Sequence, residues 1–220
     1  MRFASQGFVV AILAGCGPTS APQAPSPAPE VLSFVTVMRH RQAGTAEVRI
    51  APDGRRTAHS DYSDRGNTET ITTELVLDHR GAPRSFRATG KDHFNELIDE
   101  QLDETGGTLR WRSTSEHGHA PAGTGWYVAL SDAGEGAAVL ARALRHAPGH
   151  RLTLLPAGEA WIEDETAKQV TIDGATRRLR RIAIAGLAFQ PTLVWLDEHD
   201  AMFAAVDPWQ SFIRRGAEAV

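Results

Sequence analysis

The chain has 220 residues and carries 23 Lys and Arg against 27 Asp and Glu, a formal net charge of −4 with histidines neutral. Its basic residues are scattered apart from the pairs Arg177-Arg178 and Arg180-Arg181, so the sequence lacks the clustered basic face of a nucleic-acid-binding protein. One cysteine leaves no partner for a disulfide within the chain, and no apolar stretch beyond the N-terminus approaches the length of a membrane span.

The N-terminus has the features of an export signal. Arg2 supplies a positive charge, and residues 7–14 (GFVVAILA) form a short apolar run. A membrane-spanning helix needs about 20 apolar residues, so this run fits the removable core of a secretory signal better than a transmembrane anchor. We therefore predict a signal peptide over residues 1–15.

The only cysteine follows directly. Leu13-Ala14-Gly15-Cys16 resembles the lipobox of bacterial lipoproteins, which implies a diacylglycerol on Cys16, cleavage before it and acylation of the new amine. The alternative is an ordinary signal peptide with an incidental cysteine, but a lone thiol is a liability in an oxidising compartment. The rest of residues 16–30 is proline-rich and predicts an extended tether. With Gly17 rather than aspartate after the cysteine, we expect a lipid-anchored protein of the cell envelope, on the periplasmic face of the outer membrane.

Residues 31–220 are predicted to form one β-rich domain. Apolar and polar residues alternate over short segments, which is typical of half-buried antiparallel strands. Asp173-Gly174 predicts a hairpin turn, and a change of parity between Leu179 and Ile182 predicts a bulge or a twist. Residues 94–102 fit a helix or a strand, and we favour a strand. The other predicted strands lie at 31–38, 46–50, 71–77, 86–88, 107–112, 170–172, 179–184, 193–196 and 202–206.

Two segments have helical features. Ala137, Leu140, Ala141 and Leu144 recur at helical spacing, with Ser131 or Asp132 as the cap and Pro148-Gly149 as the end. Asp207 followed by Pro208 matches the start of a short C-terminal helix with Trp209, Phe212 and Ile213 on its apolar face. Many strands around one mid-chain helix predict a mainly β fold, a curved antiparallel sheet like a half-open barrel, with a sandwich as the alternative.

Three polar clusters are candidates for chemistry. Two imidazoles one residue apart, His117 and His119, can ligate one metal ion, but we expect them in a polar loop without further ligands. Residues 197–200 (DEHD) predict an acidic hairpin tip, and residues 61–66 (DYSDRG) predict a β-turn with an Asp–Arg pair. The sequence contains no nucleophile elbow and no phosphate-binding loop, so we expect no catalytic residue and no cofactor.

Four stretches together resemble the β-rich N-terminal region that precedes the catalytic barrel in exported proteins of the amidohydrolase superfamily. They are residues 154–161, 186–191, 194–197 and 213–216. The resemblance implies a metal-dependent hydrolase further along a longer chain. That barrel needs a strand-borne H-x-H pair and roughly 250 residues, so its metal role is not carried over to His117 and His119. We then expect either a split or truncated gene product or a domain that exists alone.

Three functions remain open. The first is a lipid-anchored, non-catalytic accessory domain that supports an amidohydrolase barrel or a partner protein. The second is a carrier or binding module for an apolar ligand such as a lipid or acyl chain, which an apolar cavity of several hundred cubic ångströms would favour. The third is a metal-dependent hydrolase, which would require His117 and His119 to converge with a carboxylate.

Overall fold

A single curved sheet of fifteen strands dominates the computed structural model, which describes residues 27–172 and 174–218. The strands follow the order β8-β7-β6-β5-β4-β3-β2-β1-β15-β14-β13-β12-β11-β10-β9, and all pairs are antiparallel except the short β9–β10 pair. Their bounds are β1 Glu30–Met38, β2 Arg41–Ile50, β3 Arg56–Asp64, β4 Asn67–Leu77, β5 Pro83–Lys91, β6 Leu97–Thr105, β7 Thr108–Arg112, β8 His117–Pro121, β9 Trp126–Tyr127, β10 Arg151–Leu155, β11 Glu159–Ile172, β12 Ala175–Ala185, β13 Thr192–Leu196, β14 Met202–Val206 and β15 Ser211–Arg214.

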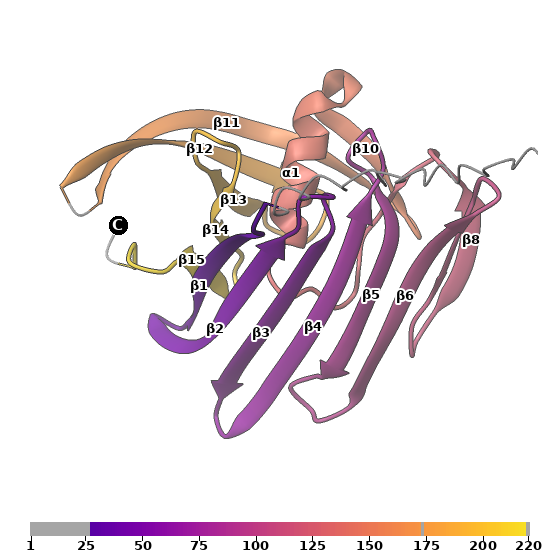
Figure 1. Ribbon diagram of the computed structural model, residues 1–220, viewed down its shortest axis with the longest axis horizontal. Coiled ribbons are helices and arrows are strands. Elements are labelled where there is room, and N and C mark those ends of the chain that lie inside the picture. Colours follow the sequence, from indigo (N-terminus) through magenta and orange to yellow (C-terminus); the bar gives the residue numbers. More distant parts are fainter. Residues whose placement is uncertain (1–26, 173, 219–220) are drawn as a thin grey trace, which may run out of the picture.

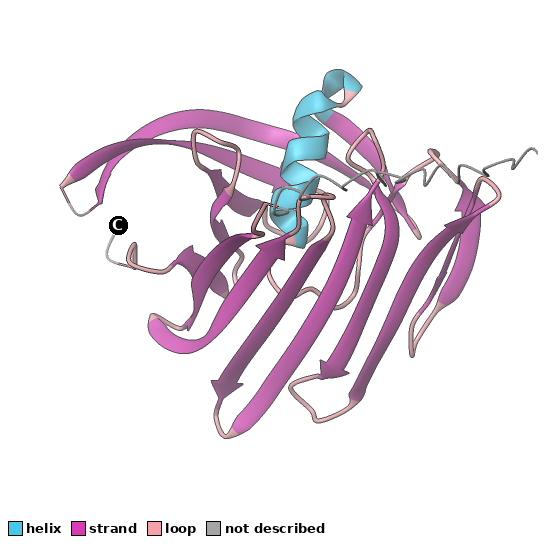
Figure 2. Cartoon of the chain, viewed as in Figure 1, coloured by secondary structure: helices cyan, strands magenta, loops and turns pink. Residues whose placement is uncertain are grey.

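The sheet curls without closing, as Figures 1 and 2 show. Its two edge strands, β8 and β9, share no ladder in the described part of the chain, although only residues 122–125 separate them in sequence. The predicted half-open barrel is therefore confirmed. We call the gap between β8 and β9 the seam.

The mid-chain helix is also confirmed. α1, Gly136–His146, lies against the inner face of the sheet, and a 3₁₀ turn follows at Pro148–His150. Its Ala138, Leu140, Ala141 and Leu144 are buried in one cluster with residues from most strands. The helix thus fills part of the space that an empty barrel would leave open.

Of the predicted bulge or twist, the bulge is not found on β12 itself at the parity change. Ile182 belongs to the cluster around α1, whereas Leu179 packs with Phe203 in a separate cluster. The strand therefore changes the face that it buries. The register shift lies on the neighbouring strand instead, between Ile162 and Asp164 of β11.

The predicted C-terminal helix is wrong. Asp207 does accept backbone hydrogen bonds from Trp209 and Gln210, at 2.7 and 2.8 Å, but they close a turn. Residues 211–214 then form β15, which fills the position between β1 and β14. The segment forms backbone hydrogen bonds with the free edges of β1 and β14. The stabilisation from these hydrogen bonds exceeds that of a single helical turn.

Two other expectations need correction. His117 and His119 lie on the edge strand β8 rather than in a loop. The strand predicted over 94–102 begins only at Leu97, because Phe94 lies in the turn between β5 and β6. Among the described helices, none is long and apolar enough to cross a membrane.

Candidate ligand-binding site

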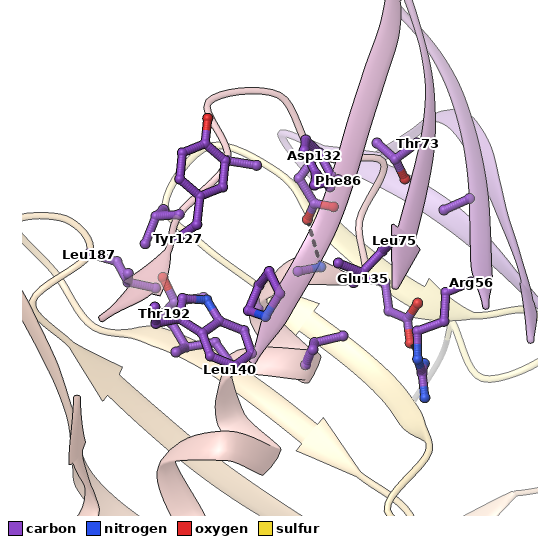
Figure 3. A pocket seen from close by; sticks show the side chains of 18 of the residues that line it. Arg56, Thr73, Leu75, Phe86, Tyr127, Asp132, Glu135, Leu140, Leu187 and Thr192 are labelled. Carbon is purple, nitrogen blue, oxygen red and sulfur yellow. Dashed lines mark hydrogen bonds and ion pairs between the residues drawn. The ribbon is translucent and has the colours of Figure 1, made fainter. Parts of the chain in front are cut away.

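A cavity lies between α1 and the inner face of the sheet (Figure 3). Its volume is about 210 Å³, and most of its lining is apolar. Ala58 of β3 and Leu75 of β4 face it because alternate strand residues point inward. Leu140 of α1 and Trp126 of the edge strand β9 close it from the other side. We call this space the inner cavity.

A second hollow of about 450 Å³ adjoins the first. Asp132, Ala137, Thr192 and Asp207 line both hollows, so the two spaces share a wall. Together they reach the size of small-molecule sites, which is roughly 300–1,000 Å³. We call the second hollow the vestibule.

The vestibule is acidic. Glu69, Asp92, Asp132 and Asp207 line it, and no Lys, Arg or His is among its described lining residues. Three of these carboxylates accept hydrogen bonds from uncharged groups: the Tyr62 hydroxyl at 3.2 Å for Glu69, and turn N–H groups for Asp92 and Asp207. Uncharged donors leave the negative charge in place. Burial raises the pKa of Glu69.

Asp132 lines both hollows and lies shortly before the first residue of α1. Its Oδ2 accepts the backbone N–H of Gly136 at 2.9 Å, which Figure 3 marks. No basic side chain among the described residues forms an ion pair with it. Burial raises its pKa to about 6, since the nearby backbone N–H groups oppose the effect of desolvation only in part.

Glu135 contrasts with Asp132 because it has two counter-ions. It is buried at the start of α1, pairs with Arg56 of β3, and accepts a hydrogen bond from Arg142 of the same helix at 3.2 Å. Burial raises the pKa of Glu135, and the two guanidinium groups oppose that rise. This cluster connects α1 to β3, and its two arginines and one glutamate together carry one net positive charge.

Glu100 spans the seam. This residue of β6 is only 2% exposed, and it accepts three hydrogen bonds: from the Tyr127 hydroxyl at 2.6 Å and from the N–H groups of Leu130 and Ser131 at 2.9 Å. Burial and then the hydrogen bond to Glu100 raise the pKa of Tyr127. No sequence motif marks Glu100, although it shares the inward parity of Ile98 and Leu102.

One end of the barrel carries an apolar rim. Successive antiparallel strands place the turns at 39–40, 65–66, 92–96, 186–191 and 207–210 at this end, which we call the mouth. Five of the six exposed large apolar side chains of the described residues lie there: Phe94, Leu97, Leu130, Phe189 and Trp209. Leu130 and Trp209 also line the vestibule, so the vestibule opens at the mouth.

The two histidines are not brought to this site. Both are exposed on β8, while Gly118 between them packs against the Trp111 ring. Their cross-strand partners are Arg112 and Arg110, which would repel a cation. In the described residues, no three His, Cys, Asp or Glu side chains gather at metal-binding spacing.

The remaining clusters have structural partners. Residues 197–200 form the predicted hairpin tip, and Asp200 accepts a hydrogen bond from Arg145 of α1 at 2.8 Å. The β-turn predicted over 61–66 is confined to residues 65–66, because residues 61–64 belong to β3. Asp64 pairs with Arg39 at 3.8 Å rather than with its neighbour Arg65. Glu159 pairs with Arg151 at 2.8 Å. Cys16 lies outside the described residues.

The fold and the hollows define a β-rich, barrel-like protein with an internal cavity. No protein-family model matches the sequence, and no curated protein matches it significantly. The chain is similar in structure to a β-barrel-like protein of the domain of unknown function DUF1849 from Brucella abortus. That match has 11% sequence identity, covers 86% of this chain and 97% of the other, and has a TM-score of 0.48.

Proposed function

We propose that this protein is a non-catalytic binding module that holds an apolar ligand, such as the acyl chain of a lipid or lipoprotein, in the inner cavity. The observation that carries the proposal is the apolar cavity between α1 and the curved sheet. Transfer of apolar surface from water stabilises a complex by about 25 cal/mol per Å², so a chain that enters this cavity gains its affinity from burial.

The vestibule and the mouth support the same function. The vestibule adjoins the cavity and opens at the mouth, which gives a ligand a route from solvent to the apolar walls. Apolar side chains at the mouth, Trp209 and Leu130 among them, would contact the ligand as it enters. Surface apolar residues that cluster around an opening are typical of binding sites.

The lipid anchor at Cys16 is part of the proposal. Its support is the sequence: a short apolar signal, the lipobox-like residues 13–16 and a proline-rich stretch before β1. Several acyl chains on one residue give stable membrane attachment, whereas one chain is marginal. We propose an envelope location on this basis. Mass spectrometry of the mature protein should find an acylated Cys16 without residues 1–15, and an intact, unmodified N-terminus would contradict the anchor.

The link to an amidohydrolase barrel or to another partner protein stays a prediction from the sequence resemblance. It would be supported if the protein co-purified with a hydrolase of that superfamily from its own cells. The binding proposal does not depend on it.

Isothermal titration calorimetry with decanol, an uncharged amphiphile, tests the binding function on the full-length protein. We expect saturable binding to the wild type. Ala137→Phe places a ring where the two hollows meet and should weaken binding at least tenfold, because it occupies the ligand's volume.

Ala143→Phe is the matched control, since the same change on the same helix lies outside both hollows. We expect it to change the affinity by less than twofold. Absence of decanol binding up to its solubility, or equal effects of the two substitutions, would overturn the proposal.

A further inference from the structure

We infer that the ligand is an amphiphile with a cationic ammonium group, which sits in the vestibule against Asp132 while the apolar chain occupies the inner cavity. The inference rests on the proposed function, since it assigns the head group of the same ligand. It follows from a carboxylate that forms no ion pair among the described residues and that lies between an acidic and an apolar hollow.

Asp132 lies where the head group of the ligand would meet its apolar chain. It lines both the inner cavity and the vestibule, so a cation beside it would stand at the entrance to the apolar space. Glu135, three residues later, pairs with Arg56 and Arg142, and Glu100 accepts hydrogen bonds from three neutral donors. Asp132, in contrast, forms no ion pair among the described residues and accepts the backbone N–H of Gly136. Buried charges are normally paired, and a bound cation would supply the pair that Asp132 lacks.

The surrounding charges favour a cation. Glu69, Asp92 and Asp207 face the vestibule with Asp132. Opposed to these four carboxylates is the N-terminus of α1, which carries roughly half a positive charge.

Other charged groups lie nearby but outside the lining of the vestibule, and two of them, Arg56 and Glu135, line the inner cavity. Arg56 and Arg142 are held by Glu135, and Arg39 lies at the mouth, with Asp64 at 3.8 Å and the Trp209 ring at 6.0 Å. His93 packs against Tyr62, with ring centroids 6.2 Å apart, and its proximity to Glu69 opposes in part the rise that burial causes in the pKa of Glu69. The vestibule therefore keeps a net negative charge at neutral pH.

An ammonium group fits this arrangement better than a bare metal ion. A metal ion needs several converging carboxylate oxygens, and no three acidic or histidine side chains of the described residues converge in this way. A single carboxylate suffices for one –NH₃⁺ group, whose charge-assisted hydrogen bond is among the stronger ones in proteins. The apolar wall next to Asp132 accommodates the carbon chain that such a group carries.

A series of ten-carbon probes with different head groups tests the inference on wild-type protein at pH 7.5. Calorimetry should give the tightest binding for decylammonium, about tenfold weaker binding for decanol and the weakest for decanoate, because one charge-assisted hydrogen bond is worth about a factor of ten or more. If decanol binds and decylammonium binds no tighter, the cationic head group is wrong while the binding function stands. If no probe binds, the proposed function itself fails.

Asp132→Asn supplies the second test, since the amide can still accept the N–H of Gly136 and preserve the start of α1. It should weaken decylammonium binding about tenfold and change decanol binding by less than twofold. Asp99→Asn, on an exposed carboxylate of β6 that pairs with Arg112, is the charge-matched control and should leave both affinities unchanged. Equal losses for both probes in Asp132→Asn, or no loss for either, would overturn the role of Asp132.

Discussion

Replacement of Glu100 by alanine would leave three donors without an acceptor, one of them buried and two part-buried. The Tyr127 hydroxyl and the N–H groups of Leu130 and Ser131 all point at this carboxylate, across the seam and next to the start of α1. Each donor left unsatisfied in a buried place costs about 1–3 kcal/mol. Because the vestibule admits water close to Leu130, we take values near the low end and expect a loss of about 4 kcal/mol in the free energy of unfolding.

Urea denaturation followed by tryptophan fluorescence measures this loss. Glu100→Gln keeps an acceptor for Tyr127 and Leu130 but turns an amide NH₂ toward Ser131, so its expected loss is smaller, about 1–2 kcal/mol. Asp99→Ala is the control on the same strand: its ion pair with Arg112 is exposed and contributes at most about 1 kcal/mol. A Glu100→Ala variant within 1 kcal/mol of the control would refute the view that this carboxylate holds the seam.

Three further changes probe other parts of the molecule. Asp132 has a folded pKa of about 6, above its ordinary value of 3.8, so its contribution to stability is present at low pH and lost as the pH rises through 6. Relative to Asp132→Asn, the free energy of unfolding of the wild type should fall by on the order of 2 kcal/mol between pH 4 and 7. A constant difference between the denaturation midpoints of the two proteins over that range would contradict this. Glu135→Gln removes the charge that pairs with two arginines and should lower the free energy of unfolding by about 3 kcal/mol, whereas a change below 1 kcal/mol would mean that water reaches this cluster. Gly44→Ala should cost at least about 2 kcal/mol because the new methyl group would overlap the backbone of Asp61, while Gly54→Ala, which meets open space, should cost only the left-handed backbone penalty of about 1 kcal/mol; similar melting temperatures for the two variants would argue against the close β2–β3 approach.

The fold was predictable wherever local pattern and long-range pairing agree. Alternation identified most strands, and the spacing of Ala137, Leu140 and Leu144 identified α1, because each pattern has a single periodicity that matches one buried face. Failure came at the C-terminus, where Asp207 makes the capping hydrogen bonds expected from its sequence, yet the following residues join the sheet. The hydrogen bonds of Asp207 determine the turn, whereas pairing with β1 and β14 determines that a strand follows it.

The candidate site was less predictable. The cavity depends on how much space α1 leaves under the sheet, and no short motif encodes that distance. Asp132 entered the sequence analysis only as a possible helix cap, and it does accept a helix N–H, but its place between two hollows depends on β3, β4 and β14 together. Glu100 was detectable in principle, since an acid on the inward parity of a strand demands buried donors. The spacing of His117 and His119 suggested a metal site, but both side chains are exposed on the edge strand β8.

The break in the barrel falls between two strands that are neighbours along the chain, which makes it a split ring whose cut ends are tied by residues 122–125. Parting the ends would break no main-chain ladder bond among the described strands. It would separate Tyr127 from the Glu100 carboxylate and from the Trp111 ring, whose centroid lies 6.0 Å away. Contacts across the seam are therefore made by side chains rather than by strand pairing, so we expect a ligand wider than the inner cavity to disrupt the contact between Tyr127 and Glu100 before any strand pair.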